Sequence, residues 1–394
     1  MNFLLFLKKE FRGLFIFAFQ RITVDIKKLF KIKYYKTEDN PSYDKNTSNI
    51  LSGIYKDLNI SSYKASWMSY KERDIKYLKV KKAIIKNTKK KFGKINKIKL
   101  NKLDKVGFEK LKKNLSSSKC KTIISKIKNK KVYNAHHVIF STNHKDKFSR
   151  IKKKYINASY DYQDIFSVPE LTLAIINEKH IIKVRDYFGC VPTVNTILLS
   201  WSFNKYNFDY GTQIFHRDCD DYRQCNLFTL LTDTNNNNGG HEIYLSSHNF
   251  LKSKKIIQLK KEKKEKYKLS PETLFNMPIG NITGYGNNDI YDYYFKDQKK
   301  ELFGSSGSSF LTDAFALHRG VPPQKKPRLI LWVSYSLLSE ASSSSRNFLG
   351  MHKKKTQTKT ILKRVKYEKI SKIIKCSDLI KYSFRNIIDF SDEK

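Results

Sequence analysis

The segment Thr212–Asp233, TQIFHRDCDDYRQCNLFTLLTD, decides how the fold of this chain is predicted. It places a histidine, an arginine and an aspartate directly before an apolar run that is typical of a β-strand. Residues two apart in an extended strand point to the same face, so His216 and Asp218 project together and Arg217 projects away. A histidine and an aspartate with this spacing also occur in capped turns, so the pair needs support from elsewhere in the chain.

That support comes from the segment FLTDAFALHRGVPPQKKPRLILWVSYSL, residues 310–337, which ends one apolar run at His318 and starts another at Arg328. A third ligand, His318, would complete a site of two histidines and one carboxylate, which holds Fe(II) and leaves three positions open. Arg328 enters a run that otherwise resembles core, where an unpaired guanidinium is costly. A dicarboxylate that chelates the metal with one end would offer its other end to the two parallel donors of this arginine.

These motifs resemble the phytanoyl-CoA dioxygenase family of Fe(II)/2-oxoglutarate-dependent oxygenases. The resemblance lies in FHRDCDDYRQCNLFTLLTDTNNNNGGHEIYLSSHN (residues 215–249) and DAFALHRGVPPQKKPRLILW (residues 313–332). It continues in two earlier stretches, VGFEKLKKNLSSSKCKTIISKIK (residues 106–128) and VRDYFGCVPTV (residues 184–194). Four separated motifs in the family's order cover roughly residues 99–338 and leave both ends of the chain unexplained.

The resemblance implies a set of roles and a fold. His216, Asp218 and His318 match the iron ligands, and Arg328 matches the residue that binds the far carboxylate of 2-oxoglutarate. The implied reaction uses Fe(II), 2-oxoglutarate and O2, with ascorbate in support, and hydroxylates a small-molecule, lipid or glycan-related substrate while releasing succinate and CO2. The carboxylate at position 218 disfavours halogenation. The implied fold is a double-stranded β-helix, a cupin-like jelly-roll.

Other histidines compete with His318 for the third position. His241 and His248 are nearer to the first pair in sequence, but neither is followed by an arginine that enters a strand. Both lie in NGGHEIYLSSHN, which resembles a loop near the family's iron, with Gly240 where the family often has proline. We interpret His136, His137 and Asp313 as structural. Asp220 and Asp221 are interpreted as solvated loop carboxylates, with the alternative that either orients a metal ligand. Residues expected on strands beside the co-substrate are Thr196, Trp201, Asn226 and Thr229.

The pattern of elements is that of an α+β protein, with helices first and a block of strands after them. Ile123, Ile124 and Ile127 continue a helical stripe that begins at Cys120, and Ser167–Gly189 is predicted as one helix, capped by Ser167. We divide the chain into a basic N-terminal extension (1–98), an oxygenase domain (99–338) and a basic C-terminal tail (339–394). The lysine-rich insert at residues 252–268 is either a flap near the iron or a solvated helix.

Charge suggests a rival function. Lys and Arg number 78 against 36 Asp and Glu, a net charge of +42, so nucleic acid or an anionic membrane is a partner to consider. Only 12 of the 78 are arginine, the preferred residue for base recognition, which disfavours a dedicated nucleic-acid reader. The N-terminal 31 residues alternate apolar and basic clusters, as in a helix that lies on a membrane or in a terminal helix that packs on its own domain. Five widely spaced cysteines indicate reduced thiols and a cytoplasmic location. We expect a monomer that acts on an organic substrate, and the positive charge favours an anionic one.

Overall fold

The computed structural model describes residues 50, 53–54, 56–58, 70–93, 102–134, 145–203, 213–218, 221–261, 288–338 and 364–391. Several expectations concern residues outside these ranges. They are the amphipathic N-terminal segment, His136, His137, Cys219, Asp220, and residues 262–268 of the lysine-rich insert.

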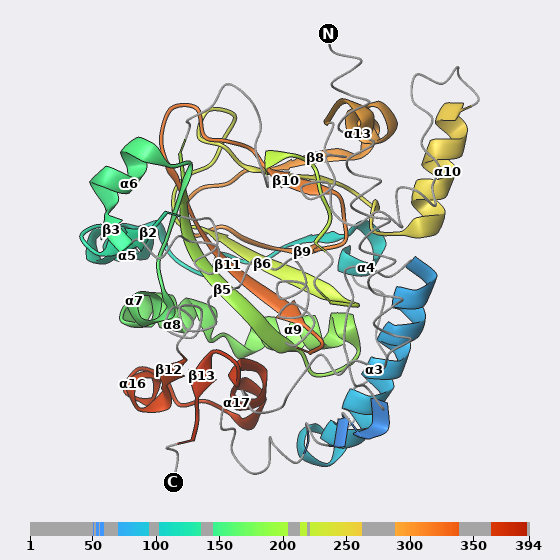
Figure 1. Cartoon of the computed structure of the whole chain (residues 1–394), viewed down its shortest axis with the longest axis horizontal. Coiled ribbons are helices and arrows are strands. Elements are labelled where there is room, and N and C mark those ends of the chain that lie inside the picture. The colour runs from blue at the N-terminus through green and yellow to red at the C-terminus, as the bar shows by residue number, and fades with distance from the viewer. Residues whose placement is uncertain are drawn as a thin grey trace, which may run out of the picture.

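A large antiparallel sheet runs through the middle of the described chain (Figure 1). Its central strands are β5 (Thr193–Ser202), β11 (Arg328–Ser336) and β6 (Gln224–Leu230), which are the apolar runs that the sequence predicts as strands. The sheet order is β1 (Phe108–Lys110), β9 (Ser309–Asp313), β6, β11, β5, β4 (Asn157–Ser159), β2 (Lys131–Tyr133) and β3 (Lys145–Lys147).

A smaller antiparallel sheet lies against one face of the large sheet. It consists of β10 (His318–Gly320), β7 (His241–Tyr244) and β8 (Lys299–Leu302), and an isolated bridge adds His216 beside His318. The chain passes several times between the two sheets. After β5 in the large sheet it forms the bridge at His216 in the small sheet and then β6 in the large one. Strands β7 and β8 belong to the small sheet, β9 to the large, β10 to the small and β11 to the large. The space between the sheets is filled by Leu230, Ile243, Leu302, Phe310 and Ala316.

Helices cover the opposite face of the large sheet, below it in Figure 1. The predicted stripe forms α5 (Ser117–Ile127), capped by Ser116, with Cys120, Ile123 and Ile127 buried. The single helix predicted for Ser167–Gly189 is wrong, because the chain forms α8 (Pro169–Ile175) and α9 (Glu178–Phe188). The side chain of Asn177 accepts a hydrogen bond from Lys179 N and so starts a new helix, while Ser167 ends α7 (Tyr162–Phe166).

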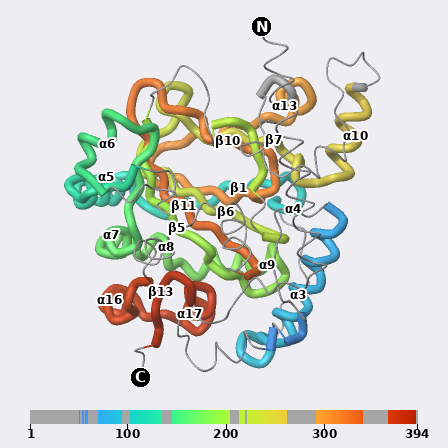
Figure 2. Tube along the Cα trace, viewed as in Figure 1, coloured from blue at the N-terminus to red at the C-terminus, as the bar shows by residue number. Residues whose placement is uncertain are grey.

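The C-terminal segment packs onto the same core. It contains β12 (Val365–Lys366), α16 (Tyr367–Ser371), α17 (Asp378–Phe384) and β13 (Ile388–Asp389), which pairs with β12 in parallel. Figure 2 traces this segment in red below the large sheet. Helix α3 (Tyr70–Phe92) also contributes side chains to this core. The division of the chain at residues 98 and 338 stays a prediction.

The small sheet carries its own helical cover. Helices α10 (Phe250–Lys261) and α13 (Asn288–Phe295) pack near it, followed by the 3-10 turn η4 (Lys296–Gln298). The described part of the lysine-rich insert is therefore helical, and it buries Ile257. The remaining helices are α4 (Lys102–Val106) and α6 (Phe148–Lys154).

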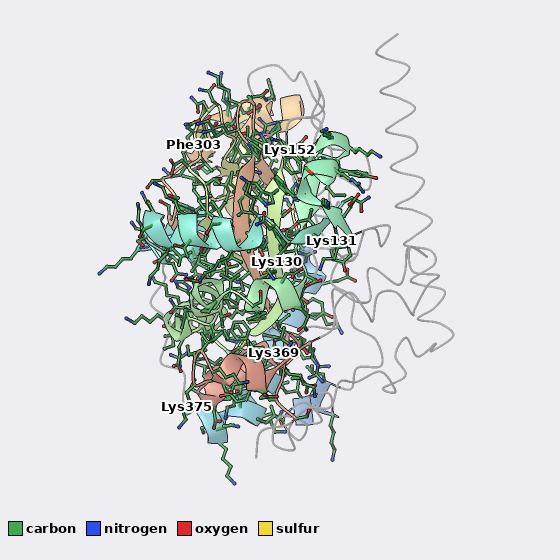
Figure 3. All side chains as sticks on the ribbon, turned by 90° about the vertical axis from the view of Figure 1, so that its left-hand side faces the viewer. Lys130, Lys131, Lys152, Phe303, Lys369 and Lys375 are labelled. Carbon is green, nitrogen blue, oxygen red and sulfur yellow. The ribbon has the colours of Figure 1, made fainter. Side chains whose placement is uncertain are left out.

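This arrangement confirms a mixed fold of helices and antiparallel sheets. Lysines lie along the face that carries α5, α6 and α16, as Figure 3 shows. Lys131, Lys152, Lys369 and Lys375 are exposed there, so this face carries part of the positive charge.

Candidate metal centre

Three of the predicted site residues meet between the sheets. His216 and His318 exchange both main-chain hydrogen bonds, each 3.0 Å from N to O, and Asp218 N donates to Ala314 O. One ligand atom from each of His216, Asp218 and His318 lies within 4.8 Å of the others. It is the one such cluster of histidine, cysteine and acidic residues found among the described residues. The HxD pair therefore joins the distant histidine, as the sequence predicts.

Main-chain carbonyls hold both imidazoles in the same way. Nδ1 of His216 lies 2.7 Å from Ile214 O, and Nδ1 of His318 lies 2.8 Å from Ala316 O. A carbonyl can only accept, so Nδ1 carries the proton and Nε2 keeps its lone pair in the neutral ring. Both Nε2 atoms point to Asp218, at 3.6 Å for His216 and 3.4 Å for His318. The rings are thus oriented as metal ligands require.

Burial and mutual charge set the protonation of the cluster. Burial and the neighbouring His318 together lower the pKa of His216 to about 4, although Asp218 acts to raise it. Burial also acts to lower the pKa of His318, but the Asp218 carboxylate outweighs it and the pKa of His318 is raised. The pKa of Asp218 is lowered despite its burial, because His318, His216 and the amide of Asn226 stabilise the anion. A carboxylate thus faces two imidazoles of unequal basicity.

Asn226 is a supporting residue whose contact the sequence did not predict. Its Nδ2 donates to Asp218 Oδ2 at 3.1 Å, from the inner face of β6. Arg217, by contrast, points away as predicted and donates to Ser247 O at 2.8 Å and to Phe315 O. It thereby ties the turn before β10 to the loop after β7. Asn226 thus orients the carboxylate of Asp218, and Arg217 fixes the main chain beside the cluster.

Arg328 is buried and has no acidic partner in the part of the chain that the structure describes. Its side chain is 6% exposed, and its guanidinium donates to Gly240 O and to Val321 O, the latter at 2.9 Å. No carboxylate of the described residues forms an ion pair with it, and its Nε has no hydrogen-bond partner there. Burial alone lowers the pKa of this arginine to about 10. The guanidinium is therefore a buried cation without a counter-ion among the described residues.

Neither of the two competing histidines belongs to the cluster. The ring of His241 is 5.2 Å from that of His318 and 4.7 Å from that of Phe228, measured between centroids. His248 is engaged elsewhere, because its Nε2 lies 2.9 Å from Asp104 O. The third member of the cluster is therefore His318.

The loop that approaches Arg328 depends on two glycines. Gly239 has φ of +70°, and a Cβ there would lie 2.5 Å from Val321 O and 3.2 Å from Nη1 of Arg328. A Cβ at Gly240 would lie 2.4 Å from the ring of Phe303. Glycine at position 240, where the resemblance suggests proline, follows from this close packing.

The other predicted positions have structural partners. Asp221 is not a solvated carboxylate, because it is buried and accepts hydrogen bonds from Leu337 N and Leu338 N at 2.8 and 3.0 Å. It holds the end of β11 and lies outside the ligand cluster. Asp313 accepts from Tyr187 and from Phe315 N, in keeping with its structural interpretation.

Of the four residues expected beside the co-substrate, two turn to other partners. Trp201 Nε1 donates to Tyr160 Oη at 3.1 Å, and the Thr229 hydroxyl pairs with that of Ser309 at 2.9 Å. Thr196 is buried on β5, and Asn226 contacts Asp218. Within the ranges described above, no helix has both the length and the apolar character of a membrane span.

Comparisons with known proteins give weak likenesses. No family model matches the chain, and no curated protein matches it. Similar solved structures include HygX from Streptomyces hygroscopicus with nickel and 2-oxoglutarate bound, at 13% identity and a TM-score of 0.37, covering 59% of this chain and 84% of HygX. EctD from S. alaskensis with 2-oxoglutarate and 5-hydroxyectoine has 12% identity and a TM-score of 0.38, over 61% of this chain and 75% of EctD. The non-heme alpha ketoglutarate dependent epimerase SnoN from nogalamycin biosynthesis has 10% identity and a TM-score of 0.35, over 60% and 78%. At these values the likeness is too low to assign a family or a reaction.

Proposed function

We propose that this chain is an Fe(II)- and 2-oxoglutarate-dependent dioxygenase that hydroxylates an organic substrate. The observation that carries the proposal is the convergence of His216, Asp218 and His318 within 4.8 Å of one another. Two imidazoles with free Nε2 atoms and one carboxylate match the ligand set of non-heme Fe(II) oxygenases. With 2-oxoglutarate and O2, bound Fe(II) supplies an oxidation that gives succinate, CO2 and a hydroxylated product.

The fold that we propose is a double-stranded β-helix. Its support is the order β9, β6, β11, β5 in the large sheet, together with the bridge at His216, β10, β7 and β8 in the small one. The chain crosses between the sheets in a way that brings residues 216 and 318 side by side. The phytanoyl-CoA dioxygenase-like assignment remains part of this proposal.

Different residues would bind the metal and the 2-oxoglutarate. His216, Asp218 and His318 would hold one side of the metal, and Asn226 would keep the carboxylate of Asp218 in place through its 3.1 Å hydrogen bond. Arg328 would bind the far carboxylate of 2-oxoglutarate with its buried guanidinium. Phe228 lies beside His241, 4.7 Å between ring centroids, and stacks on Trp332 at 9°, so these rings would help to shield that side of the site from water.

Turnover without added substrate tests the proposal. Purified full-length protein is incubated with Fe(II), ascorbate, O2 and 2-oxoglutarate, and succinate is quantified. We expect slow formation of succinate that needs both Fe(II) and 2-oxoglutarate, and we expect none from the variant His216→Ala. Formation of succinate at the same rate by that variant would contradict the proposal, as would failure of the wild-type protein to bind either component. The organic substrate is then sought by metabolite profiling of cells that lack the protein.

A further inference from the structure

His241 is a buried polar side chain to which the proposed function gives no part. It lies on β7, is 5% exposed, and its Nε2 has no hydrogen-bond partner among the described residues. A buried nitrogen left unpaired is costly and needs an explanation. The side chains around it are largely aromatic, with Phe228 at 4.7 Å and Phe310 at 5.8 Å between ring centroids.

The position of His241 connects the two ends of the candidate site. Its ring lies 5.2 Å from that of His318 and is nearly parallel to it, at 23°. The preceding residue, Gly240, accepts a hydrogen bond through its carbonyl from the guanidinium of Arg328. His241 is therefore adjacent to a member of the metal cluster and follows directly the residue that Arg328 contacts.

Because His241 is close to both ends, a molecule that bridges them would lie near its ring. A 2-oxo diacid has a 2-oxo carboxylate for the metal, a second carboxylate for Arg328, and acceptor oxygens at both ends. We propose that His241 hydrogen-bonds through Nε2 to the bound 2-oxo diacid and so adds to the affinity that Arg328 provides. This inference rests on the proposed function, and it assigns His241 to recognition of the co-substrate and not to the metal.

Two other roles for His241 make different predictions. As a fourth metal ligand it would contribute to metal affinity, although the ligand cluster of the described residues consists of His216, Asp218 and His318. As a packing residue it would contribute to stability alone.

The experiment measures metal binding and 2-oxoglutarate binding separately. Full-length protein is titrated first with Fe(II) and then, in the loaded state, with 2-oxoglutarate, both by calorimetry without O2. The variant His241→Phe keeps a ring against Phe228 but removes both nitrogens, and His241→Gln keeps a polar group near the Nε2 position. His180→Leu is the matched control, because His180 on α9 is also buried with an unpartnered nitrogen, Nδ1. His241→Leu serves if the phenylalanine variant does not fold.

We expect His241→Phe to bind 2-oxoglutarate about tenfold or more weakly, as for the loss of one hydrogen bond to a charged group, with Fe(II) stoichiometry and affinity unchanged. His241→Gln should recover most of the loss, and His180→Leu should bind both as the wild type does. Equal 2-oxoglutarate affinity in His241→Phe and wild type overturns the inference but leaves the proposed function intact. Loss of Fe(II) from His241→Phe overturns it in favour of a metal ligand. If the loaded wild-type protein binds no 2-oxoglutarate, the proposed function itself fails.

Discussion

Arg328 donates to two main-chain carbonyls and has no carboxylate partner among the described residues. Replacing it by methionine keeps much of the apolar bulk and removes the charge. We expect Arg328→Met to weaken 2-oxoglutarate binding by roughly 100-fold, since two charge-assisted hydrogen bonds are lost, without changing Fe(II) binding. Anaerobic titration of the Fe(II)-loaded protein checks this. Unchanged 2-oxoglutarate affinity in this variant would show that the buried guanidinium serves only the backbone.

The protonation of His318 predicts how metal affinity depends on pH. A metal binds the neutral imidazole, and Asp218 raises the pKa of His318 while the pKa of His216 is about 4. As the pH falls through the raised pKa of His318, protons compete with the metal there, so affinity should fall, and it should be flat at higher pH. Titration with Mn(II) at several pH values measures this. An affinity that rises as the pH falls would contradict the assignment of His318.

The pKa shifts of His318 and Asp218 have opposite effects on how the stability of the metal-free protein depends on pH. The raised pKa of His318 contributes stability below its unfolded-state pKa, and this is lost as the pH rises through the folded-state value. The lowered pKa of Asp218 contributes stability above its unfolded-state pKa, and this is lost as the pH falls through the folded-state value. We expect Asp218→Asn to lower the pKa of His318, which NMR titration of the imidazole follows. A pKa of His318 that stays raised would contradict the pairing.

For single residues, the sequence predicted the direction of a side chain where that direction depends only on spacing along a strand. His216 and Asp218 share a face because they are two residues apart, and Arg217 points away for the same reason. Asn226 and Asp221 were beyond reach of such reasoning, since their contacts depend on how β6 and β11 lie beside the HRD turn. Asp221 was misjudged because an acidic run normally indicates solvent, and its buried main-chain donors become visible only in three dimensions.

Among the connecting elements, the turn before β7 allows a direct test. Gly239 has φ of +70°, and a Cβ at this position would contact Val321 O and Arg328. We expect Gly239→Ala to lose the roughly 1–2 kcal/mol of the left-handed conformation plus the cost of the contact with Val321 O. Gly93 has the same φ at the end of α3 with nothing within 4 Å of a Cβ, so Gly93→Ala is the matched control. Urea denaturation compares the two free energies of unfolding. Equal losses would contradict the close packing of the turn on Arg328.

The elements themselves were predicted where apolar residues repeat over a long window. Helix α5 and the strands β5, β6 and β11 follow from such repeats. The predicted helix Ser167–Gly189 failed because helical periodicity continues across Ile176 and Asn177, although Asn177 caps a separate helix. The short strands of the small sheet, three or four residues each, carry too little pattern to be placed by sequence alone.

Viewed as a whole, the molecule carries its excess charge as lysine, some of it exposed on the face of α5, α6 and α16 (Figure 3). If this charge only solvates the chain, binding to DNA should not distinguish one sequence from another. We expect equal affinities for unrelated duplexes and a steep loss with salt, about 0.9 log units per neutralised phosphate. Fluorescence anisotropy at several salt concentrations checks this. A clear preference for one sequence would favour the rival function as a nucleic-acid reader.

The global arrangement was predictable only in outline. The α+β character follows from the order of helical and strand patterns, while the pairing of His216 with His318 across 102 positions depends on the crossing of the chain between two sheets. The sequence resemblance suggested this pairing, and the structure places the two residues side by side. Residues 364–391 were assigned to a tail, but they contribute side chains to the main core.

The most direct test of the central claim locates the metal itself. Crystals of the full-length protein, grown without O2 and soaked in Fe(II), are measured at the iron absorption edge. The account predicts one anomalous peak, bonded to Nε2 of His216, Nε2 of His318 and the carboxylate of Asp218, and no such peak in crystals of His216→Ala. A peak at other residues, or none in the wild-type protein at saturating Fe(II), would contradict it.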